Sequence, residues 1–481
     1  MRKSSIFKIA ACMSVLLLLP LYEAAAAFAE DQAIVREQRK ISYNGSLYTV
    51  DLIRIDLKDP TIQVKAVAAN HQVGSVQPFT EMMEENEAVV GINGTFFDAF
   101  TKDIDYRTPY GILVNNNDLF YGGDKETSIT VSTDKEASVQ RLAIDSSVNV
   151  GRYGFKLNGV DRYYGDQERG AWVFTKDYGD VADEPGVKVS IGQDQKVISI
   201  SDEPVRIPEG GKVLLLSTDH PIEQVSKQIK PGDKFVMNQT VSNLDSKKVS
   251  PIEQLQLAIG AGPKLLTGGQ VDIDFERDRF NDPLVTSEAN VRSFAGVDDN
   301  GRLVLGIISY CTIEQMANVL LETGMTDAIN LDGGASSALY YQGTLLRSPG
   351  RLLSNALIVQ QTDRPQVQIS VNGHVTGDKT GYIENGITMV PFRILLNRLN
   401  AKYEWNADDS SLHITKGKEQ IDLRLHSQTA QVNGEAVTMD AEPQIINGRI
   451  FVPLRFVAQS LGAPVEWNGE LYRVNLSISV K

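Results

Sequence analysis

The segment NLDGGASS, at Asn330–Ser337, carries side chains whose types and spacing could do chemistry on an oxygen-rich ligand. Asp332 supplies a carboxylate, and the two glycines after it let the main chain turn sharply and approach a bound group with no Cβ atom in the way. The two serines add hydroxyl groups beside main-chain N–H groups, a combination that suits an anionic ligand. An Asp-Gly turn in a plain β-hairpin is the alternative that the segment alone leaves open. The predicted ligand contacts in this segment are Gly333, Gly334, Ser336 and Ser337.

The elements that must position this segment are predicted to be a helix and two strands. Thr312 and Gln315 fit a capping box, an apolar stripe follows, and Gly324 ends the helix. The run DAINL, at 327–331, is typical of a strand, and the run SALYY of the next strand. Asp332 is therefore expected where a strand ends.

A second group of polar residues follows another buried strand. The run GINGTFFD, at 91–98, places Asn93 at the strand end and Asp98 beyond two aromatic residues. Asn-Gly is usually only a turn, and we expect the aromatic residues in the core before we expect them at a sugar. Arg292 precedes a predicted strand pair, where its planar guanidinium could hold a phosphate or form an ordinary salt bridge.

Composition and charge limit the function classes. The chain has 481 residues and a formal net charge of −14. The length predicts two or three domains, and the charge excludes nucleic acid and anionic membrane surfaces as expected partners. Five His and two Cys show no metal-ligand spacing, so no cofactor is predicted, while use of a divalent metal stays open.

Residues 1–29 are predicted to be an export signal. Basic residues precede an apolar run, Ile9–Leu21, that is short for a membrane span, and Ala-Phe-Ala at 27–29 supplies a cleavage pattern. We expect a protein that is secreted or associated with the cell wall; an N-terminal anchor that stays uncleaved is the alternative. Cleavage leaves Cys311 as the one cysteine, so no intrachain disulfide is expected.

The chain from residue 30 to residue 362 is rich in strand patterns. Apolar and polar side chains alternate over 41–69, and 124–250 shows further strands separated by turns. Helical periodicity is clear in few places. We therefore predict an α+β fold, with a mixed, β-rich catalytic domain that contains few helices.

The order of the motifs resembles one protein family. GINGTFFD, TPYGILV, YGFKLNGVDRYYG, AIGAGPKLL, VRSFAGVD and NLDGGASS follow one another as in the phosphodiester glycosidase family, over about residues 41–361. Two departures are visible. The segment GIISYCTIEQ is short and lacks the Asp-Gly-Arg that many members carry, and Ala335 stands where the family pattern usually has a third glycine.

This resemblance implies hydrolysis of a glycosyl phosphodiester. The implied catalytic residues are Asn93, Arg292 and Asp332, and further predicted substrate contacts are Asp98, Gly111 and Arg351. A phosphate monoester is a stable leaving group, so breaking the sugar C1–O bond needs little general-acid help. We expect Asp332 to act as nucleophile or as the base that activates water, and Arg292 with the glycine amides to hold the phosphate.

Residues 367–481 form a second unit with an internal repeat. VPFR at 390–393 and VPLR at 452–455 are each followed, at the same offset, by Glu-Trp-Asn, so the period is 62 residues. The pattern predicts a small α+β module of two strand-helix-strand repeats and resembles the copper amine oxidase N-terminal domain. The histidines show no repeated ligand spacing, so copper is not implied. We expect the module to be a spacer or to attach the protein to a wall polymer.

The sequence as a whole predicts an exported hydrolase that cleaves the sugar C1–O–phosphate bond in cell-surface or extracellular glycans. One alternative is an enzyme on the same scaffold that cleaves P–O bonds or processes exopolysaccharide. Another is a non-catalytic protein that binds wall glycan.

Overall fold

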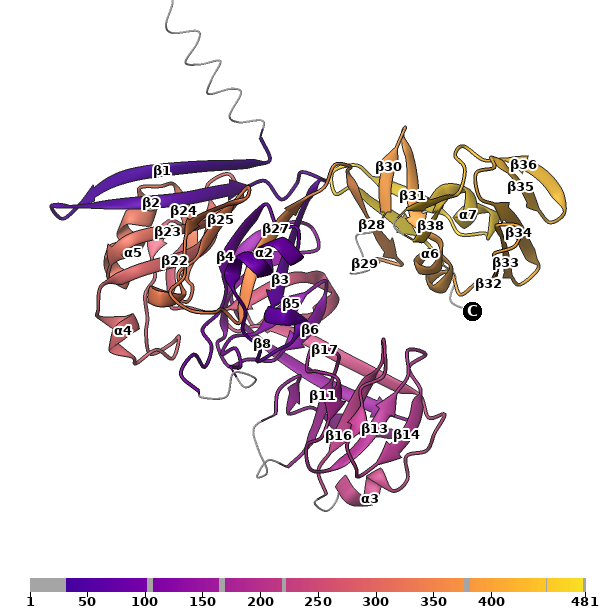
Figure 1. Ribbon diagram of the computed structural model, residues 1–481, viewed down its shortest axis with the longest axis horizontal. Helices are drawn as coiled ribbons and strands as arrows, with labels where there is room; N and C mark the ends of the chain where they lie inside the picture. Colours follow the sequence, from indigo (N-terminus) through magenta and orange to yellow (C-terminus); the bar gives the residue numbers. More distant parts are fainter. Residues whose placement is uncertain are drawn as a thin grey trace, which may run out of the picture.

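The structure is a computed structural model that describes residues 32–101, 107–163, 169–218, 222–375, 381–446 and 448–478. The predicted export signal at 1–29 lies outside these residues. Figure 1 shows a main body of packed sheets, a lobe of strands that projects from it, and a separate C-terminal module coloured orange to yellow. The predicted α+β, β-rich class is confirmed, because strands far outnumber helices among the described residues.

The first layer of the main body is a sheet of seven described strands. The buried faces of the helix α5 (Ile313–Leu321) pack on one side of this sheet, against Phe294, Val304 and Ile308. Thr312 and Gln315 form the predicted capping box at its start. The strands in spatial order are β1 (Ile34–Tyr43), β2 (Ser46–Ile55), β23 (Leu303–Cys311), β22 (Asn290–Asp298), β24 (Met325–Asn330), β20 (Lys264–Thr267) and β21 (Gln270–Val271).

The second layer is a sheet of five described strands. The helix α2 (Phe79–Glu85) buries Phe79, Met82 and Met83 against its outer face. Its inner face shares one hydrophobic core with the first sheet, so the layers run helix, sheet, sheet, helix. The strands in spatial order are β26 (Thr344–Arg347), β25 (Leu339–Tyr341), β4 (Val90–Asn93), β27 (Asn355–Gln361) and β3 (Ile62–Ala68).

A third sheet carries the projecting lobe. Two long strands of this sheet, β8 (Ala137–Val150) and β17 (Phe235–Asn243), pair over their whole shared length and run outward into the lobe. The described strands of the third sheet are β18 (Val249–Pro251), β17, β8, β7 (Thr127–Ser132), β19 (Leu255–Gly260), β5 (Leu113–Asn115) and β6 (Asp118–Tyr121), with β9 (Tyr153–Lys156) beside β8. The lobe adds β10 (Gly159–Val160), β11 (Ala171–Phe174), β16 (Lys212–Leu216), β13 (Val187–Ile191) and β14 (Val197–Ser201), the pair β12 (Val181–Ala182) and β15 (Val205–Arg206), and the helix α3 (Ile222–Ser226).

The C-terminal module has its own hydrophobic core and shows the 62-residue repeat in its elements. The strand β31 (Ile387–Pro391) and the helix α6 (Phe392–Arg398) recur as β38 (Arg449–Pro453) and α7 (Leu454–Ser460). One sheet contains β37 (Gln444–Ile446), β38, β31, β30 (Gly381–Glu384), β28 (Gln366–Val371), β40 (Arg473–Leu476) and β39 (Val465–Asn468), with β29 (His374–Val375) beside β28. The other contains β32 (Lys402–Asn406), β33 (Ser411–Lys416), β34 (Glu419–Arg424), β35 (Thr429–Val432) and β36 (Glu435–Thr438).

The module contacts the main body through a small number of polar groups. The guanidinium of Arg473 donates to the carbonyl oxygen of Thr133 at 2.7 Å and to the carboxylate of Asp134 at 2.9 Å. Gln366, directly after the linker, donates from its main-chain N–H to the oxygen of Pro60. In the part of the chain that the structure describes, no helix has the length and apolar character needed to cross a membrane.

Candidate functional site

The turn that carries Asp332 joins the two layers of the main body. β24 ends at Asn330 and pairs with β22 and β20 in the first sheet, whereas β25 pairs with β4 and β26 in the second. Between them, Gly334–Ser336 form a short 3₁₀ turn. Since the strands on either side belong to different sheets, the plain β-hairpin alternative is wrong, and Asp332 sits at an edge where two sheets meet.

Asn93 holds this turn in place. Its side-chain amide donates to the main-chain oxygen of Asp332 at 2.6 Å, and its Oδ1 accepts from the hydroxyl of Ser293 at 2.7 Å and from the N–H of Ala338 at 3.0 Å. The residue is only 2% exposed. The predicted meeting of Asn93 and Asp332 therefore occurs, but the amide of Asn93 is engaged within the protein. Its geometry is that of a residue that positions Asp332.

The Asp332 residue is half-buried, with protein groups packed around its carboxyl group. Burial raises the pKa of Asp332 to about 6, while the hydroxyl of Ser336, the N–H of Gly333 and the charge of Arg351 act in the opposite direction. The Gly333 N–H donates to Oδ1 at 2.9 Å, whereas the Ser336 hydroxyl faces the carboxyl group without a regular hydrogen bond. A carboxyl group with this pKa is mostly ionised at pH 7 and can still exchange a proton near neutrality.

The glycines and serines of the turn are used partly for packing. Gly334 has a φ of 59°, and a Cβ atom there would lie 3.1 Å from Nδ2 of Asn290. Both the backbone conformation and the lack of space therefore favour glycine. The hydroxyl of Ser337 donates to the oxygen of Val291 at 3.3 Å. The Gly333 N–H donates to the Asp332 carboxylate. This hydrogen bond and that of the Ser337 hydroxyl stabilise the conformation of the turn.

Arg292 is held mainly by main-chain carbonyl groups, although its Nη1 lies beside the Asp332 turn, 3.9 Å from where a Cβ atom on Gly333 would be. It is 3% exposed, and its Nη2 donates to the main-chain oxygens of Glu288 at 2.6 Å and Leu284 at 3.0 Å. These carbonyl groups belong to the short helix α4 (Pro283–Thr286) and the residues after it. The observed contacts make Arg292 a structural cation, and they leave the predicted hold on a phosphate without support.

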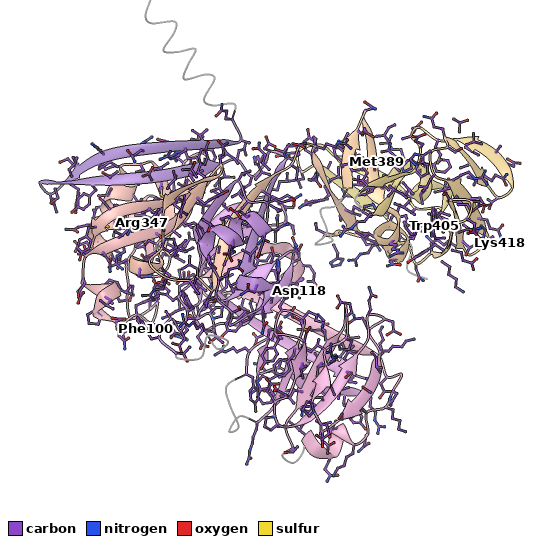
Figure 2. All side chains as sticks on the ribbon, viewed as in Figure 1. Phe100, Asp118, Arg347, Met389, Trp405 and Lys418 are labelled. Atoms are coloured by element: carbon purple, nitrogen blue, oxygen red, sulfur yellow. The ribbon has the colours of Figure 1, made fainter. Side chains whose placement is uncertain are left out.

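Arg351 is the cation whose charge acts on Asp332. Its loop is tied to the Asp332 turn by the N–H of Gly350, which donates to the oxygen of Ala335 at 2.7 Å. The guanidinium stacks 5.2 Å from the ring centre of Phe100, whose side chain is 85% exposed and is labelled at the lower edge of the main body in Figure 2. An arginine so placed could bind an anion beside the Asp332 carboxylate.

The remaining predicted contacts have structural roles. Asp98 caps its own turn, because Oδ1 accepts from the N–H groups of Phe100 at 3.4 Å and Thr101 at 3.2 Å. Gly111 is buried against another backbone segment, where an added Cβ atom would lie 1.6 Å from the oxygen of Gly260. Hydrogen bonding within the turn explains Asp98, and close packing of the backbone explains Gly111.

Sequence reasoning missed residues that support the site. Ser293 holds the amide of Asn93, and Asn355 accepts from the N–H of Thr95 at 2.8 Å. An added Cβ at Gly94 would lie 2.1 Å from Oδ1 of Asn355, which explains the glycine of the NGT motif. These residues lie within the motifs VRSFAGVD and SNALIV, but only the pairing of distant strands brings them to Asn93.

A second buried carboxyl group lies at the junction of the lobe and the main body. Asp161 forms part of the wall of a cavity of about 270 Å³, and burial raises its pKa to about 8. Its two oxygens accept from the N–H and the hydroxyl of Thr175 at 2.6 and 2.7 Å. This bonding gives Asp161 a structural role. Among the described residues, no group of three or more His, Cys, Asp or Glu could hold a metal ion.

Two families match separate parts of the chain. Residues 187–360 match the phosphodiester glycosidase family, and residues 370–476 match the copper amine oxidase N-terminal domain. Both predicted resemblances are therefore confirmed. The first match includes Arg292, Asp332 and Arg351, and the second covers nearly all of the repeat module.

Solved structures and one curated relative give weaker likenesses. A hypothetical protein from Synechocystis has a TM-score of 0.57 at 21% identity, over 69% of this chain and 62% of its own. A protein from Burkholderia pseudomallei that is designated as exported has a TM-score of 0.53 at 16% identity, over 65% of this chain and 74% of its own. Both likenesses concern the fold. A protease inhibitor from Brevibacillus choshinensis is 27% identical over 113 residues, which are 22% of this chain and about a third, 34%, of that relative's length.

Proposed function

We propose that the phosphodiester glycosidase domain of this chain hydrolyses glycosyl phosphodiesters at the bond between the sugar C1 and the phosphate oxygen. The observation that supports this most is the Asp332 carboxyl group, which lies in the family-matched region, at the junction of two sheets, with a pKa of about 6 and with Arg351 beside it. A carboxylate next to a cation is suited to a substrate that has an electron-deficient carbon at one end and an anion at the other.

In this mechanism the Asp332 carboxylate acts at C1 and Arg351 binds the phosphate. As a base, Asp332 takes a proton from the water whose oxygen bonds to C1. As a nucleophile, it first forms an ester bond to C1, and water then breaks that bond, adding its oxygen to C1 and releasing a proton to the solvent. The bond between C1 and the phosphate oxygen breaks, and its electron pair leaves with the phosphate monoester, a stable leaving group that needs little general-acid help. Arg351 balances the charge that builds up on this oxygen. The Asn93 amide keeps the Asp332 main chain fixed throughout.

The test is the position of a heavy-oxygen label. The full chain is given a nucleotide-activated N-acetylhexosamine or a wall-polymer fragment in water enriched in heavy oxygen, and the products are separated by mass spectrometry. Attack at C1 places the label on the free sugar and none on the phosphate. Label on the phosphate would contradict the proposal and show P–O cleavage. Unchanged substrate that raises the melting temperature would support a binding protein instead.

The anomeric form of the first product distinguishes the two roles of Asp332. If Asp332 is a nucleophile, the sugar is released with its original configuration, and if it is a base, the configuration is inverted. Proton NMR during the first minutes of the reaction, before the sugar mutarotates, reads this directly.

We also propose that the protein acts outside the cell. The predicted signal at 1–29 supports export, and the repeat module would then attach the enzyme to a wall polymer or space it from one. Expression in a Gram-positive host with and without residues 1–29, followed by fractionation of wall and medium, checks this. Retention of the full-length chain in the cytoplasm would contradict it.

A further inference from the structure

The two repeats of the C-terminal module are related by a local two-fold axis. The strands β31 and β38 pair antiparallel, with Val390 opposite Val452, which is its own equivalent 62 residues later. The neighbouring pair is Met389 and Pro453. Their equivalents in the other repeat are Phe451 and Pro391, and these two residues also lie opposite each other. The pairing thus maps onto itself, so the axis passes between the two strands.

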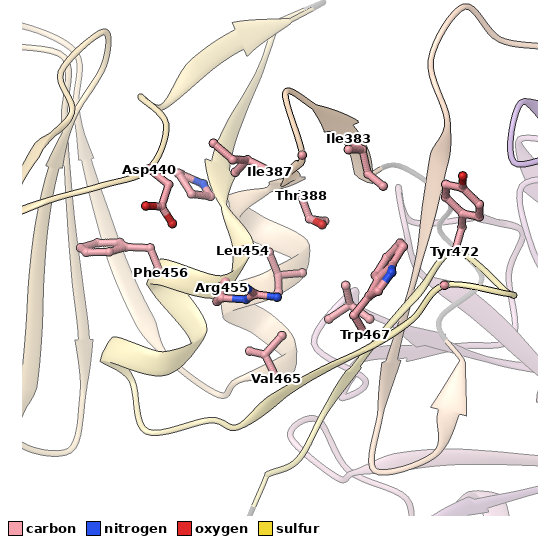
Figure 3. A pocket seen from close by; sticks show the side chains of 14 residues that line it. Ile383, Ile387, Thr388, Asp440, Leu454, Arg455, Phe456, Val465, Trp467 and Tyr472 are labelled. Atoms are coloured by element: carbon pink, nitrogen blue, oxygen red, sulfur yellow. The ribbon is translucent and has the colours of Figure 1, made fainter.

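This axis generates two matching pockets, which we call the twin pockets. The first has a volume of about 370 Å³ and is shown in Figure 3. The hairpin at 383–388 from the first repeat forms one wall, and the start of α7 with Trp467 from the second repeat forms the other. In Figure 3 Trp467, Arg455 and Thr388 surround the same hollow.

The second pocket repeats this arrangement with the repeats exchanged. It has a volume of about 470 Å³, and its walls are the hairpin residues Ile445 and Gly448–Ile450 and the start of α6 with Trp405. Each residue that lines the second pocket has its equivalent, 62 positions away, in the lining of the first. Trp405 corresponds to Trp467, and Arg393 to Arg455. Each pocket therefore needs both repeats.

The side chains of the twin pockets suit a sugar ring with an acidic group. Trp467 is 41% exposed and forms a T-shaped contact with Tyr472, with ring centres 5.7 Å apart, so its ring is held by a neighbour while part of it meets solvent. The C–H face of a pyranose packs on such a ring. Arg455 and Arg393 are exposed, and within the described residues neither forms an ion pair. Asp440, in the first pocket, can accept from sugar hydroxyl groups.

We propose that the module is a bivalent binding site for an anionic polysaccharide, with one sugar unit in each of the twin pockets. The local charge selects the occupant, because an arginine that forms no ion pair among the described residues lines each pocket together with its tryptophan. The twin pockets are separate sites built from different residues, so the module can hold two sugar units at once and join two polymer segments.

Binding is tested on the full chain that carries Asp332→Asn, so that hydrolysis does not remove the polymer. The probe is polygalacturonate, with a neutral glucan, poly(glycerol phosphate) and single-stranded poly(dT) for comparison. We expect short oligogalacturonates to bind with two sites per chain. Polymer affinity should fall about 100-fold for Trp467→Ala or Trp405→Ala, because each variant loses bivalent attachment, and should vanish for the double variant.

The controls separate contact from folding. Arg393→Ala should weaken binding, whereas Arg398→Ala, on the same helix but outside the pocket, should not. Trp467→Phe keeps an aromatic ring and should retain most of the affinity. The proposal is overturned if the double tryptophan variant binds polygalacturonate like the parent, or if poly(dT) or poly(glycerol phosphate) binds more tightly than the sugar polymer.

An agglutination assay tests whether the module joins two polymer segments. Beads coated with polygalacturonate should agglutinate with the parent protein, while the two single tryptophan variants should coat the beads without joining them. Binding of the parent without agglutination would overturn bivalency. None of these outcomes depends on turnover at Asp332, so the result stands apart from the proposed hydrolysis.

Discussion

The side-chain amide of Asn93 donates to the main-chain oxygen of Asp332 at 2.6 Å, although 239 positions separate the two residues. Asn93 ends a strand of the second sheet, and Asp332 follows a strand of the first. The bond therefore ties the edges of two sheets together at the place where the carboxyl group lies. Catalysis at Asp332 and the stability of this junction should be separable by mutation.

Asp332→Asn should abolish turnover, with a loss of at least about 100-fold, without destabilising the protein. The pKa of Asp332 is raised by folding from 3.8 to about 6, so ionisation disfavours the folded state as the pH rises through this interval. The variant should melt at the same temperature as the parent near pH 4 and a few degrees higher at pH 8. Thermal unfolding at both pH values measures this, and a melting temperature that falls at pH 8 would show that the turn depends on the charge.

Arg351→Ala should reduce kcat/KM by about 10- to 100-fold, because a charged hydrogen bond to the phosphate is lost. The charge of Arg351 lowers the pKa of Asp332, so its removal should also move the acid limb of the pH–rate profile to higher pH. Arg347→Ala, on the nearby exposed strand β26, is the matched control and should leave both quantities unchanged. An unshifted acid limb would mean that Arg351 does not act on Asp332.

Arg292→Ala should destabilise the protein instead of changing phosphate recognition. Its guanidinium donates to the oxygens of Leu284 and Glu288, and removing it leaves these carbonyl groups without a donor, at a cost of about 1–3 kcal/mol. Urea unfolding measures the loss. If the variant is as stable as the parent but loses phosphodiester turnover selectively, Arg292 contacts the substrate after all.

Asn93→Ala should cost about 2–4 kcal/mol of unfolding free energy, because the main-chain oxygen of Asp332, the hydroxyl of Ser293 and the N–H of Ala338 all lose their partner. Ser293→Ala removes one of these bonds and should cost less. Turnover of the folded fraction of Asn93→Ala should also fall, since the turn is no longer held. Full activity with lowered stability would restrict Asn93 to a structural role.

Fragments 30–362 and 367–481 should each fold alone. In the second fragment, the first strand β28 pairs in parallel with β40 near the chain end, so the module closes on itself. Its contact with the main body rests on few polar groups, with Arg473 and Thr133 among them. Separate cooperative unfolding transitions in calorimetry would agree, and a fragment without such a transition would refute independent folding.

Features that depend on neighbouring residues or on repetition could be predicted from the sequence. The capping box of Thr312 and Gln315, the strand end before Asp332 and the 62-residue period all reappear in the structure. Each is readable because hydrogen bonds across three or four residues, or a recurring apolar pattern, leave a local trace in the chain.

Contacts between distant residues could not be predicted in this way, because they depend on how the strands pair. That the Asp332 turn joins two sheets follows from strand pairing, which is long-range and is not encoded in any short segment. The different roles of Arg292 and Arg351 also depend on the fold, since Nη2 of Arg292 is used by nearby carbonyl groups, whereas the charge of Arg351 lowers the pKa of Asp332. The twin pockets arise in the same way, because each is built from both repeats, and the two-fold axis that joins them exists only once β31 and β38 have paired.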